Sequence, residues 1–402
     1  MHFTKKNIKP EVYYIIDIGT YKLRAISVKL KNKGIQILEY AEKRQDSSYF
    51  INNECTNISG LSENIWDLIS KFSPVKWSEN PELICTYPFG ENFSKTKTIN
   101  YKRSRQHTPI TIKELGKIIE SVEKLCLKKV SSEIYETYGR DMKDIHIILS
   151  KIEHIKIDTQ MYPKIVGREW ELLNIKLQNI FIPREKYETL IQIGNSIWKK
   201  IYKVLPSEYC MPLMFSHNNM CVIDIGAGTS NICIKKNGAI IALTKIPIGI
   251  GHLIDKIKSQ SSYSGSQIIE SLDLKNTFTE QKETFIKVWR RSIGIALCEL
   301  LEWEVCPHTF FVYGWGDNNS FIRDALLDLD FAKYGVKITK KIEFVEEDMS
   351  TILSNIESIS LEHIKKIPLG MFALLLETKN ILQKDGDIVS SSLENALHKL
   401  GY

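Results

Sequence analysis

The 402-residue sequence lacks any long hydrophobic run. A membrane-spanning helix needs about 20 consecutive apolar residues, and the densest apolar stretch, at 371–376, is much shorter. Residues 1–10 are polar, and the apolar run at 13–18 is too short for the core of a secretory signal. We therefore expect a cytoplasmic protein that does not cross a membrane.

The sequence also lacks closely paired cysteines, since none of its eight cysteines forms a C-x-x-C pair. Paired spacings are typical of zinc sites, redox motifs and disulfide frameworks. Cys221 and Cys233 lie instead in apolar runs. This pattern favours reduced, buried thiols and argues against a zinc site.

No strong excess of either charge is present, because the net charge is only +6. A mild positive charge favours an acidic partner or an anionic membrane surface without requiring one, and we expect no nucleic-acid partner. The content of 43% hydrophobic and 25% charged residues is typical of globular proteins. A chain of this length holds two or three domains.

What the sequence does contain is one internal duplication. Two segments share the order strand, Asp-Ile-Gly, a turn with threonine, strand, a turn with Lys-Asn and Gly, strand. A single repeat of this length indicates two related halves, not a solenoid. The predicted strands are 12–18, 23–30 and 35–40 in the first segment, and 221–225, 231–234 and 239–243 in the second.

The duplicated turns have the chemistry of a phosphate-binding site. Glycine lets a backbone approach an anion closely, and outward N–H groups form a nest for phosphate oxygens. A carboxylate at the end of the preceding strand holds hydrated Mg²⁺, which makes Asp17 and Asp224 the candidate metal residues. The candidate phosphate-binding residues are Gly19, Thr20, Tyr21, Lys22, Gly226, Ala227, Gly228 and Thr229. One such turn is more typical of a plain hairpin, but two copies favour a nucleotide clamp.

A third loop follows the predicted strand at 309–313. Gly314 and Gly316 flank Trp315 there, ahead of a predicted helix beginning at Phe321. Glycines in such a loop let it pass close to a base or a ribose. Alone, the pattern is typical of an ordinary strand-to-helix turn.

The remaining periodicities predict helices and short strands. Thr111 and Glu114 form a capping box at the start of one helix. The predicted helices are 62–72, 111–128, 184–199 and 285–301, and the further predicted strands are 145–149, 154–157 and 173–177.

These motifs, in this order, resemble those of the FtsA family of bacterial cell-division proteins, within the actin-like ATPase superfamily. Residues 17–22 are similar to the family's first phosphate loop, and 224–229 to its second. The stretch 246–255 resembles the segment after the second loop, and 312–316 stands at the adenosine loop. The resemblance covers about residues 12–376.

The resemblance implies an α/β actin-like ATPase fold, with two ribonuclease-H-like lobes flanking a nucleotide cleft and an FtsA-type inserted subdomain. The implied cofactors are ATP and Mg²⁺, with slow ATP hydrolysis at most and no catalytic residue assigned. The implied function is cell division at the septum, as a divisome component of the bacterial cytoskeleton. The implied partners are the tubulin-like division GTPase (FtsZ-like), other division proteins, further copies of the chain in a filament, and the inner face of the cell membrane.

The resemblance also suggests domain boundaries. The lobe 1 core (1A) is expected at 1–82 and 158–206, with the inserted 1C-like subdomain at 83–157. The lobe 2 core (2A) is expected at 207–255 and 289–376, a shortened 2B subdomain at 256–288, and a C-terminal tail at 377–402.

Three alternatives share this fold. A pilus or secretion assembly protein of the PilM type would dock a peptide from a membrane protein. A nucleotide-free pseudo-ATPase scaffold would explain Trp315 and Asn231, where the family has glycine and aspartate. A sugar or acyl kinase would need a catalytic aspartate, for which Asp158 is the mid-chain candidate.

Overall fold

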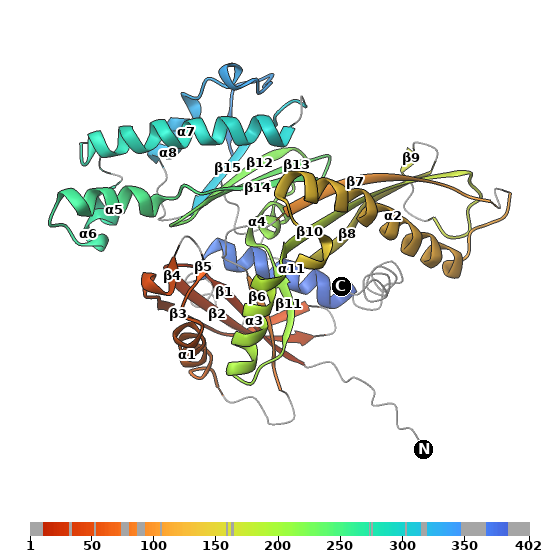
Figure 1. Cartoon of the computed structure of the whole chain (residues 1–402), viewed down its shortest axis with the longest axis horizontal. Coiled ribbons are helices and arrows are strands. Elements are labelled where there is room, and N and C mark those ends of the chain that lie inside the picture. Colours follow the sequence, from red (N-terminus) through yellow and green to blue (C-terminus); the bar gives the residue numbers. More distant parts are fainter. Residues whose placement is uncertain are drawn as a thin grey trace. The chain divides into compact units, whose positions relative to one another are not determined.

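A computed structural model shows the architecture of the chain (Figure 1). Contacts divide the chain into two compact units, which are described separately. The first comprises Met1–Phe89, Lys186–Met214 and Glu347–Leu382, and the second Gly90–Glu185, Phe215–Glu346 and Gln383–Tyr402. The structure describes residues 11–31, 34–51, 54–73, 80–86, 93–104, 107–157, 160–161, 165–272, 274, 276–301, 304–314, 320–346 and 367–384.

The first unit is built on a five-stranded sheet in the order β11-β6-β1-β2-β3. The strands are β1 (Val12–Ile18), β2 (Lys22–Lys31), β3 (Gly34–Arg44), β6 (Glu82–Thr86) and β11 (Ile201–Leu205). β1, β2 and β3 form the predicted antiparallel meander, and β6 and β11 add parallel strands. The apolar run of β1 is buried from Val12 to Ile16, as expected for a central strand.

Helices complete the first unit. α1 (Ile58–Ile69) packs on β2 and β3, and Asn57 caps it by accepting the Gly60 N–H. The other elements are η1 (Ser47–Tyr49), β4 (Phe50–Ile51), β5 (Glu54–Cys55), α3 (Arg184–Ser196), α4 (Ser207–Cys210), η3 (Met211–Met214) and α11 (Leu369–Lys384).

The second unit contains a sheet of the same plan, in the order β14-β13-β12-β15-β16. Its strands are β12 (Met220–Ile225), β13 (Ser230–Lys236), β14 (Ala239–Ile246), β15 (Thr309–Gly314) and β16 (Glu343–Phe344). Three antiparallel strands are again followed by two parallel ones. The internal duplication predicted from the sequence is therefore present in the backbone.

Helices of the second unit bury their apolar faces on this sheet. Trp289 of α7 is fully buried, and its indole N–H donates to the Ser230 hydroxyl at 3.1 Å. This bond satisfies the polar end of a large buried ring. The helices are α5 (Ile250–Gln260), α6 (Gly265–Ser271), α7 (Thr279–Leu301), α8 (Ser320–Leu327) and η4 (Ala332–Tyr334).

A four-stranded sheet, in the order β7-β10-β8-β9, belongs to the second unit as well. Its strands are β7 (Phe93–Lys102), β8 (Ile145–Ile157), β9 (Gln160–Met161) and β10 (Leu172–Pro183), and α2 (Ile112–Tyr138) packs against it after a cap at Thr111; η2 (Met142–Asp144) precedes β8. The Thr96 hydroxyl donates to the Ile241 carbonyl at 3.3 Å, which links β7 to β14.

The capping box predicted for α2 forms only by half. Thr111 Oγ1 accepts the Glu114 N–H at 3.2 Å, but both Glu114 carboxylate oxygens accept from Arg103 at 2.6 Å. Arg103 is only 2% exposed, and its guanidinium lies over the Trp170 ring. A buried cation requires a counter-charge, so Glu114 pairs with Arg103 and not with the helix N-terminus.

Several predicted boundaries need correction. β8 is one strand, not two, because it continues to pair with β10 on both sides of Glu153, where the register shifts by one residue. The segment 83–86 belongs to the first sheet, and β10 joins the four-stranded sheet, so this sheet exceeds the inserted segment predicted at 83–157. α11 clusters with the first unit, although residues up to 376 were expected in lobe 2. The other subdomain assignments stay predictions.

The cysteines are free thiols. Burial raises the pKa of Cys85 and Cys306 to about 12, so both remain protonated and unreactive at neutral pH. Six of the eight thiols are buried, as the sequence pattern favours, whereas Cys298 is exposed and Cys55 half-buried.

Candidate functional site

The first candidate turn joins β1 to β2. The Gly19 N–H donates to the Lys22 carbonyl at 3.0 Å and closes the turn. A Cβ on Gly19 would lie 2.8 Å from that carbonyl oxygen, which only glycine avoids. Thr20 is half-buried, and its backbone N–H has no acceptor within the described ranges. This N–H is therefore a donor that a phosphate oxygen could accept from.

Gln45, directly after β3, supports this turn with two hydrogen bonds. Its backbone N–H donates to the Tyr21 carbonyl at 2.9 Å, and its side-chain amide donates to the Gly19 carbonyl at 2.5 Å. Gln45 is only 5% exposed. The sequence reasoning missed it, because a glutamine at the end of a strand carries no motif.

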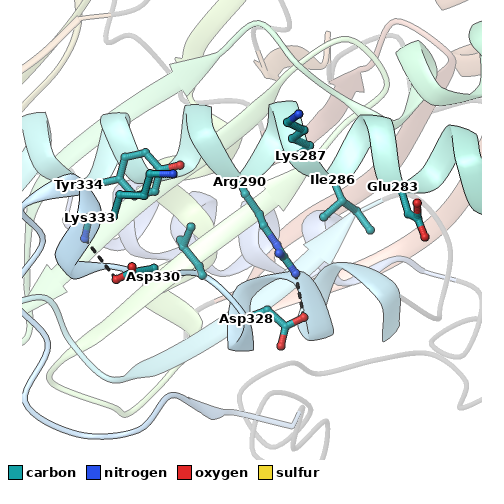
Figure 2. Close-up of a pocket in the computed structure, with 9 residues that line it drawn as sticks. Glu283, Ile286, Lys287, Arg290, Asp328, Asp330, Lys333 and Tyr334 are labelled. Carbon is teal, nitrogen blue, oxygen red and sulfur yellow. Dashed lines mark hydrogen bonds and ion pairs between the residues drawn. The ribbon is translucent and has the colours of Figure 1, made fainter.

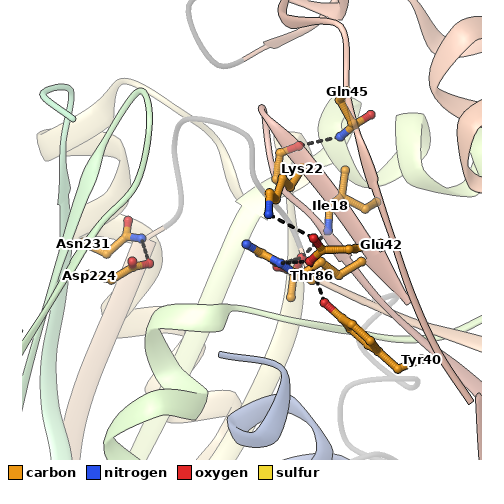
Figure 3. Close-up of polar contacts among 11 residues, drawn as sticks. Ile18, Lys22, Tyr40, Glu42, Gln45, Thr86, Asp224 and Asn231 are labelled. Carbon is orange, nitrogen blue, oxygen red and sulfur yellow. Dashed lines mark hydrogen bonds and ion pairs between the residues drawn. The ribbon is translucent and has the colours of Figure 1, made fainter. Parts of the chain in front are cut away.

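A polar ladder crosses the sheet beside this turn (Figure 3). Asp17 of β1 lies opposite Arg24 of β2, which lies opposite Glu42 of β3. Arg24 Nη1 donates to Asp17 Oδ2 at 2.8 Å, and Arg24 Nε lies 3.8 Å from Glu42 Oε2. The Thr86 hydroxyl of β6 donates to Asp17 Oδ1 at 3.0 Å and accepts the Ile18 N–H at 2.8 Å.

Glu42, on the last strand of this ladder, accepts hydrogen bonds from two further side chains. Lys22 Nζ lies 3.0 Å from one carboxylate oxygen, and the Tyr40 hydroxyl donates to the other at 2.8 Å. Burial opposes ionisation of Glu42, but these donors and Arg24 together lower its pKa. Burial likewise opposes the charge of Arg24, but Asp17 outweighs it and raises the Arg24 pKa. The ladder is therefore a charged network at neutral pH.

The second candidate turn, between β12 and β13, repeats the first. The Gly226 N–H donates to the Thr229 carbonyl at 2.8 Å. The start of α5 takes the place of Gln45, since the Ile250 N–H donates to the Gly226 carbonyl at 2.9 Å and the Gly251 N–H to the Ala227 carbonyl at 2.8 Å. Backbone groups thus support this turn, where a side chain supports the first.

Gly249 makes this close packing possible. A Cβ at Gly249 would lie 2.4 Å from the Gly226 oxygen and 2.5 Å from the Ala227 oxygen. The stretch 246–255, which resembles the segment after the FtsA second loop, therefore supports the turn directly.

Asp224 stands where Asp17 stands in the first sheet, with Asn231 opposite it. Asn231 Nδ2 donates to Asp224 Oδ2 at 3.0 Å, while Asn231 Oδ1 is buried and has no hydrogen-bond partner in the described part of the chain. Lys245 of β14 lies opposite Asn231. The ladder here therefore runs acid, amide, base.

Gly314 ends β15 beside the second turn. Its φ is +133°, and a Cβ would lie 2.2 Å from the Ile225 oxygen, so only glycine is tolerated there. Gly316 and Trp315 lie outside the described residues, as do Asp158 and the tail beyond residue 384.

A separate pocket of 390 Å³ lies on α7 and the segment that follows α8 (Figure 2). Its acidic and basic side chains balance in number, and Arg290 Nη2 lies 2.9 Å from Asp328 Oδ2. No sequence motif marks it. The lining residues are Glu283, Ile286, Lys287, Arg290, Asp328, Leu329, Asp330, Lys333 and Tyr334.

Among the described residues, no cluster of three or more histidine, cysteine or acidic side chains is arranged to hold a metal ion. No helix in the described ranges has the length and hydrophobicity needed to span a membrane.

Neither a protein-family model nor a curated protein sequence matches this chain. Solved structures do. A chain of the PilM-PilN type IV pilus biogenesis complex aligns with 96% of this chain and 99% of its own length, with a TM-score of 0.60 and 10% identity.

The fold is that of the actin-like ATPases. This confirms the predicted fold class. MreB 5 of Spiroplasma citri, bound to AMPPNP, aligns with 94% of this chain and 99% of its own, at a TM-score of 0.49 and 8% identity. The ethanolamine utilization protein EutJ of Carboxydothermus hydrogenoformans aligns with 92% of each chain, at 0.40 and 14% identity. At 10% identity, the likeness to the PilM-PilN chain extends to the fold alone.

Proposed function

We propose that this protein binds ATP on its two glycine turns and serves as an assembly platform of the PilM type, docking a peptide from a membrane-protein partner. The observation that carries the proposal is the repetition of one turn, with the same closing bond, register and sheet order, in two halves of an actin-like fold. Backbone N–H groups at such turns form nests for phosphate oxygens, and two copies of the turn favour a nucleotide clamp over two plain hairpins.

The PilM-type partner is favoured by the extent of the structural match. The alignment with the PilM-PilN chain covers 96% of this chain and so includes the four-stranded sheet as well as both repeated sheets. That protein belongs to a type IV pilus biogenesis complex, and we extend this role to the present chain.

An FtsA-type division protein is the second candidate. Residues 17–22, 224–229 and 246–255 carry its resemblance, and the third segment packs on the second turn. In this case the partner is the tubulin-like division GTPase, the chain forms filaments, and it contacts the membrane from the cytoplasmic side.

ATP binding is tested by titration calorimetry on the full chain and on turn variants. Thr20→Ala and Thr229→Ala each remove a hydroxyl donor, and each is expected to weaken ATP binding about 10- to 100-fold, the value of one hydrogen bond to a charged group. Thr284→Ala, on the exposed face of α7, is the matched control and is expected to bind as the wild type does. A wild-type chain that gives no heat with ATP would contradict the proposal.

The partner is tested with fluorescent peptides and purified chain, with and without ATP. One peptide is the cytoplasmic tail of a pilus assembly membrane protein, and the other is the C-terminal tail of the division GTPase. The proposal expects saturable binding of the pilus peptide only. Binding of the GTPase tail alone would transfer the function to the second candidate.

A further inference from the structure

A buried polar cluster lies between α2 and the four-stranded sheet and involves no residue of either glycine turn. Glu123 and Cys126 lie one turn apart on α2, and Ser150 of β8 lies opposite Asn179 of β10. The Ser150 hydroxyl donates to Glu123 Oε1 at 2.9 Å, and Asn179 Nδ2 donates to Cys126 Sγ at 3.5 Å. Each residue of the helix pair contacts one of the strand pair, which brings the Glu123 carboxyl and the Asn179 amide together under the helix.

Two oxygen atoms of this cluster lack a hydrogen-bond donor. Glu123 and Asn179 are both 0% exposed, and neither Glu123 Oε2 nor Asn179 Oδ1 has a partner in the described part of the chain. A buried acceptor that has lost its water and found no donor is destabilising, and such atoms are few in folded proteins. Two of them in one cluster indicate a donor that serves both.

The basic side chains around the cluster are engaged elsewhere. On β7, Lys95 and Lys97 reach α2, but their ammonium groups lie 3.9 and 2.5 Å from the carboxylate of Glu133. On β8, the residues that follow Ser150 include Lys151 and Glu153, which lie 3.5 Å from each other. β10 carries no charged residue from 177 to 183. Glu123 therefore forms no ion pair among the described residues.

The proton of Glu123 is a donor that satisfies both oxygens at once. A neutral carboxyl has one O–H group, and an amide oxygen accepts from it. Burial raises the pKa of Glu123 to about 7, and the Ser150 bond offsets only part of this rise. Burial also raises the pKa of Cys126 to about 12, so this thiol keeps its own proton and adds no charge to the cluster.

We propose that a single proton, carried by Glu123 and donated to Asn179 Oδ1, latches α2 onto the four-stranded sheet, and that its loss at alkaline pH loosens this helix. Without the proton, a carboxylate with no counter-charge lies among the apolar side chains that join α2 to the sheet. Opening of the helix hydrates that charge, so deprotonation favours the open state. The device does not depend on the proposed binding of ATP.

The proton is detected by infrared difference spectroscopy of the full chain between pH 6 and pH 8. We expect the wild type to show the band of a protonated carboxyl at pH 6 and to lose it at pH 8. Glu123→Gln should lack this band, and Glu136→Gln, on the exposed side of α2, should keep it. In Asn179→Ala the band should move to higher frequency, because the O–H group has lost its acceptor.

The loosening of α2 is measured by hydrogen exchange of the same proteins, corrected for the intrinsic effect of pH on exchange. Because the folded chain binds this proton more tightly, protection of α2 in the wild type should fall about 10-fold from pH 6 to pH 8. Glu123→Gln should keep its protection, since its amide accepts from Ser150 and donates to Asn179 without titrating. Peptides of α7 are the internal reference and should not change.

Three results would overturn the inference. A wild-type spectrum without the protonated band at pH 6 would show that Glu123 is ionised there, as it would be if a water molecule donated to both oxygens. An unmoved band in Asn179→Ala would remove Asn179 as the acceptor. Equal pH dependence of α2 protection in Glu123→Gln and the wild type would remove the latch. The wild-type spectrum decides the first point even if a variant fails to fold.

Discussion

The first hairpin, from β1 to β2, and the second, from β12 to β13, have the same backbone and different charges. Each turn is closed by the N–H of its first glycine, and in each an aspartate lies opposite the same position of the next strand. In the first sheet the row runs Asp17, Arg24, Glu42, and in the second Asp224, Asn231, Lys245.

This difference teaches that the two copies share a scaffold but not a chemistry. Turn geometry depends on glycine and on backbone bonds, which both copies keep. The charge order depends on single side chains, which differ between the copies. An arginine beside the aspartate neutralises the first row next to its turn, whereas in the second row a neutral amide fills that place.

The largest predicted effect concerns how each turn is supported. Gly249→Ala would press a methyl group against two carbonyl oxygens of the second turn. We expect a loss of about 3 kcal/mol in the free energy of unfolding, since overpacking against backbone has no cheap relief. Urea unfolding followed by circular dichroism measures it.

Gly370→Ala is the matched control, because a Cβ there meets nothing within 4 Å and the residue lies in α11. It is expected to be neutral or slightly stabilising. Equal stability of the two variants would show that the close approach of Gly249 to the second turn does not exclude a side chain.

The next prediction concerns Glu123, a buried carboxyl that, unlike Asp17, pairs with no cation among the described residues. Glu123 of α2 is fully buried, and the Ser150 hydroxyl donates to its Oε1 at 2.9 Å. Burial raises the Glu123 pKa from 4.5 to about 7, and the Ser150 bond offsets only part of this. Because the folded chain binds the proton more tightly than the unfolded chain, stability is highest below about pH 4.5 and falls as the pH rises through 7.

We expect the wild type to lose about 2 kcal/mol between about pH 5 and pH 8 through this group, and Glu123→Gln to lose none of it. Urea unfolding at several pH values measures the difference. Glu136→Gln, on the exposed side of the same helix, should keep the wild-type slope. Parallel curves for the wild type and Glu123→Gln would show that Glu123 is not strained by burial.

Of these features, the sequence foretold the repeated backbone best. The strands of both hairpins and the start of α2 at Thr111 follow from apolar runs and cap residues, which are local signals. Gly19 and Gly226 were assigned to the turns for the same reason.

The features that escaped prediction depend on contacts between distant segments. Gln45 contacts the first turn only because β3 ends beside it. Glu114 pairs with Arg103, and does not complete the capping box, only because Arg103 is buried nearby. The pairing of Arg24 with Asp17 needed the register of β1 and β2 as well as their existence. β10 was recognised as a strand, but periodicity does not say which sheet a strand joins.

A smaller effect on stability concerns the residue that lies beside each aspartate on the adjacent parallel strand. Thr86 bonds both the Ile18 N–H and Asp17, while the corresponding neighbour of Asp224 is Tyr313. Thr86→Val leaves a buried N–H without its acceptor and is expected to cost about 1.5 kcal/mol. Thr86→Ser keeps the hydroxyl and should lie within about 0.5 kcal/mol of the wild type. Thermal unfolding of both variants measures the cost. An equal cost for the two would show that the Thr86 hydroxyl does not stabilise the fold.

The smallest predicted effect concerns Lys22, the charged residue of the first turn. Its ion pair with Glu42 is solvent-exposed on both sides, at 42% and 41% of the side chains. Lys22→Gln is therefore expected to change the free energy of unfolding by no more than about 0.5 kcal/mol, and less in high salt. A change above about 1.5 kcal/mol would mean that the pair holds the turn in place.

The most direct test of the central claim is a crystal structure of the chain grown with AMPPNP and Mg²⁺. We predict phosphate oxygens within hydrogen-bonding distance of the backbone N–H groups of Thr20 and Gly228, on one nucleotide. Crystals grown at saturating AMPPNP in which both turns are empty, or in which the nucleotide occupies another part of the protein, would contradict it.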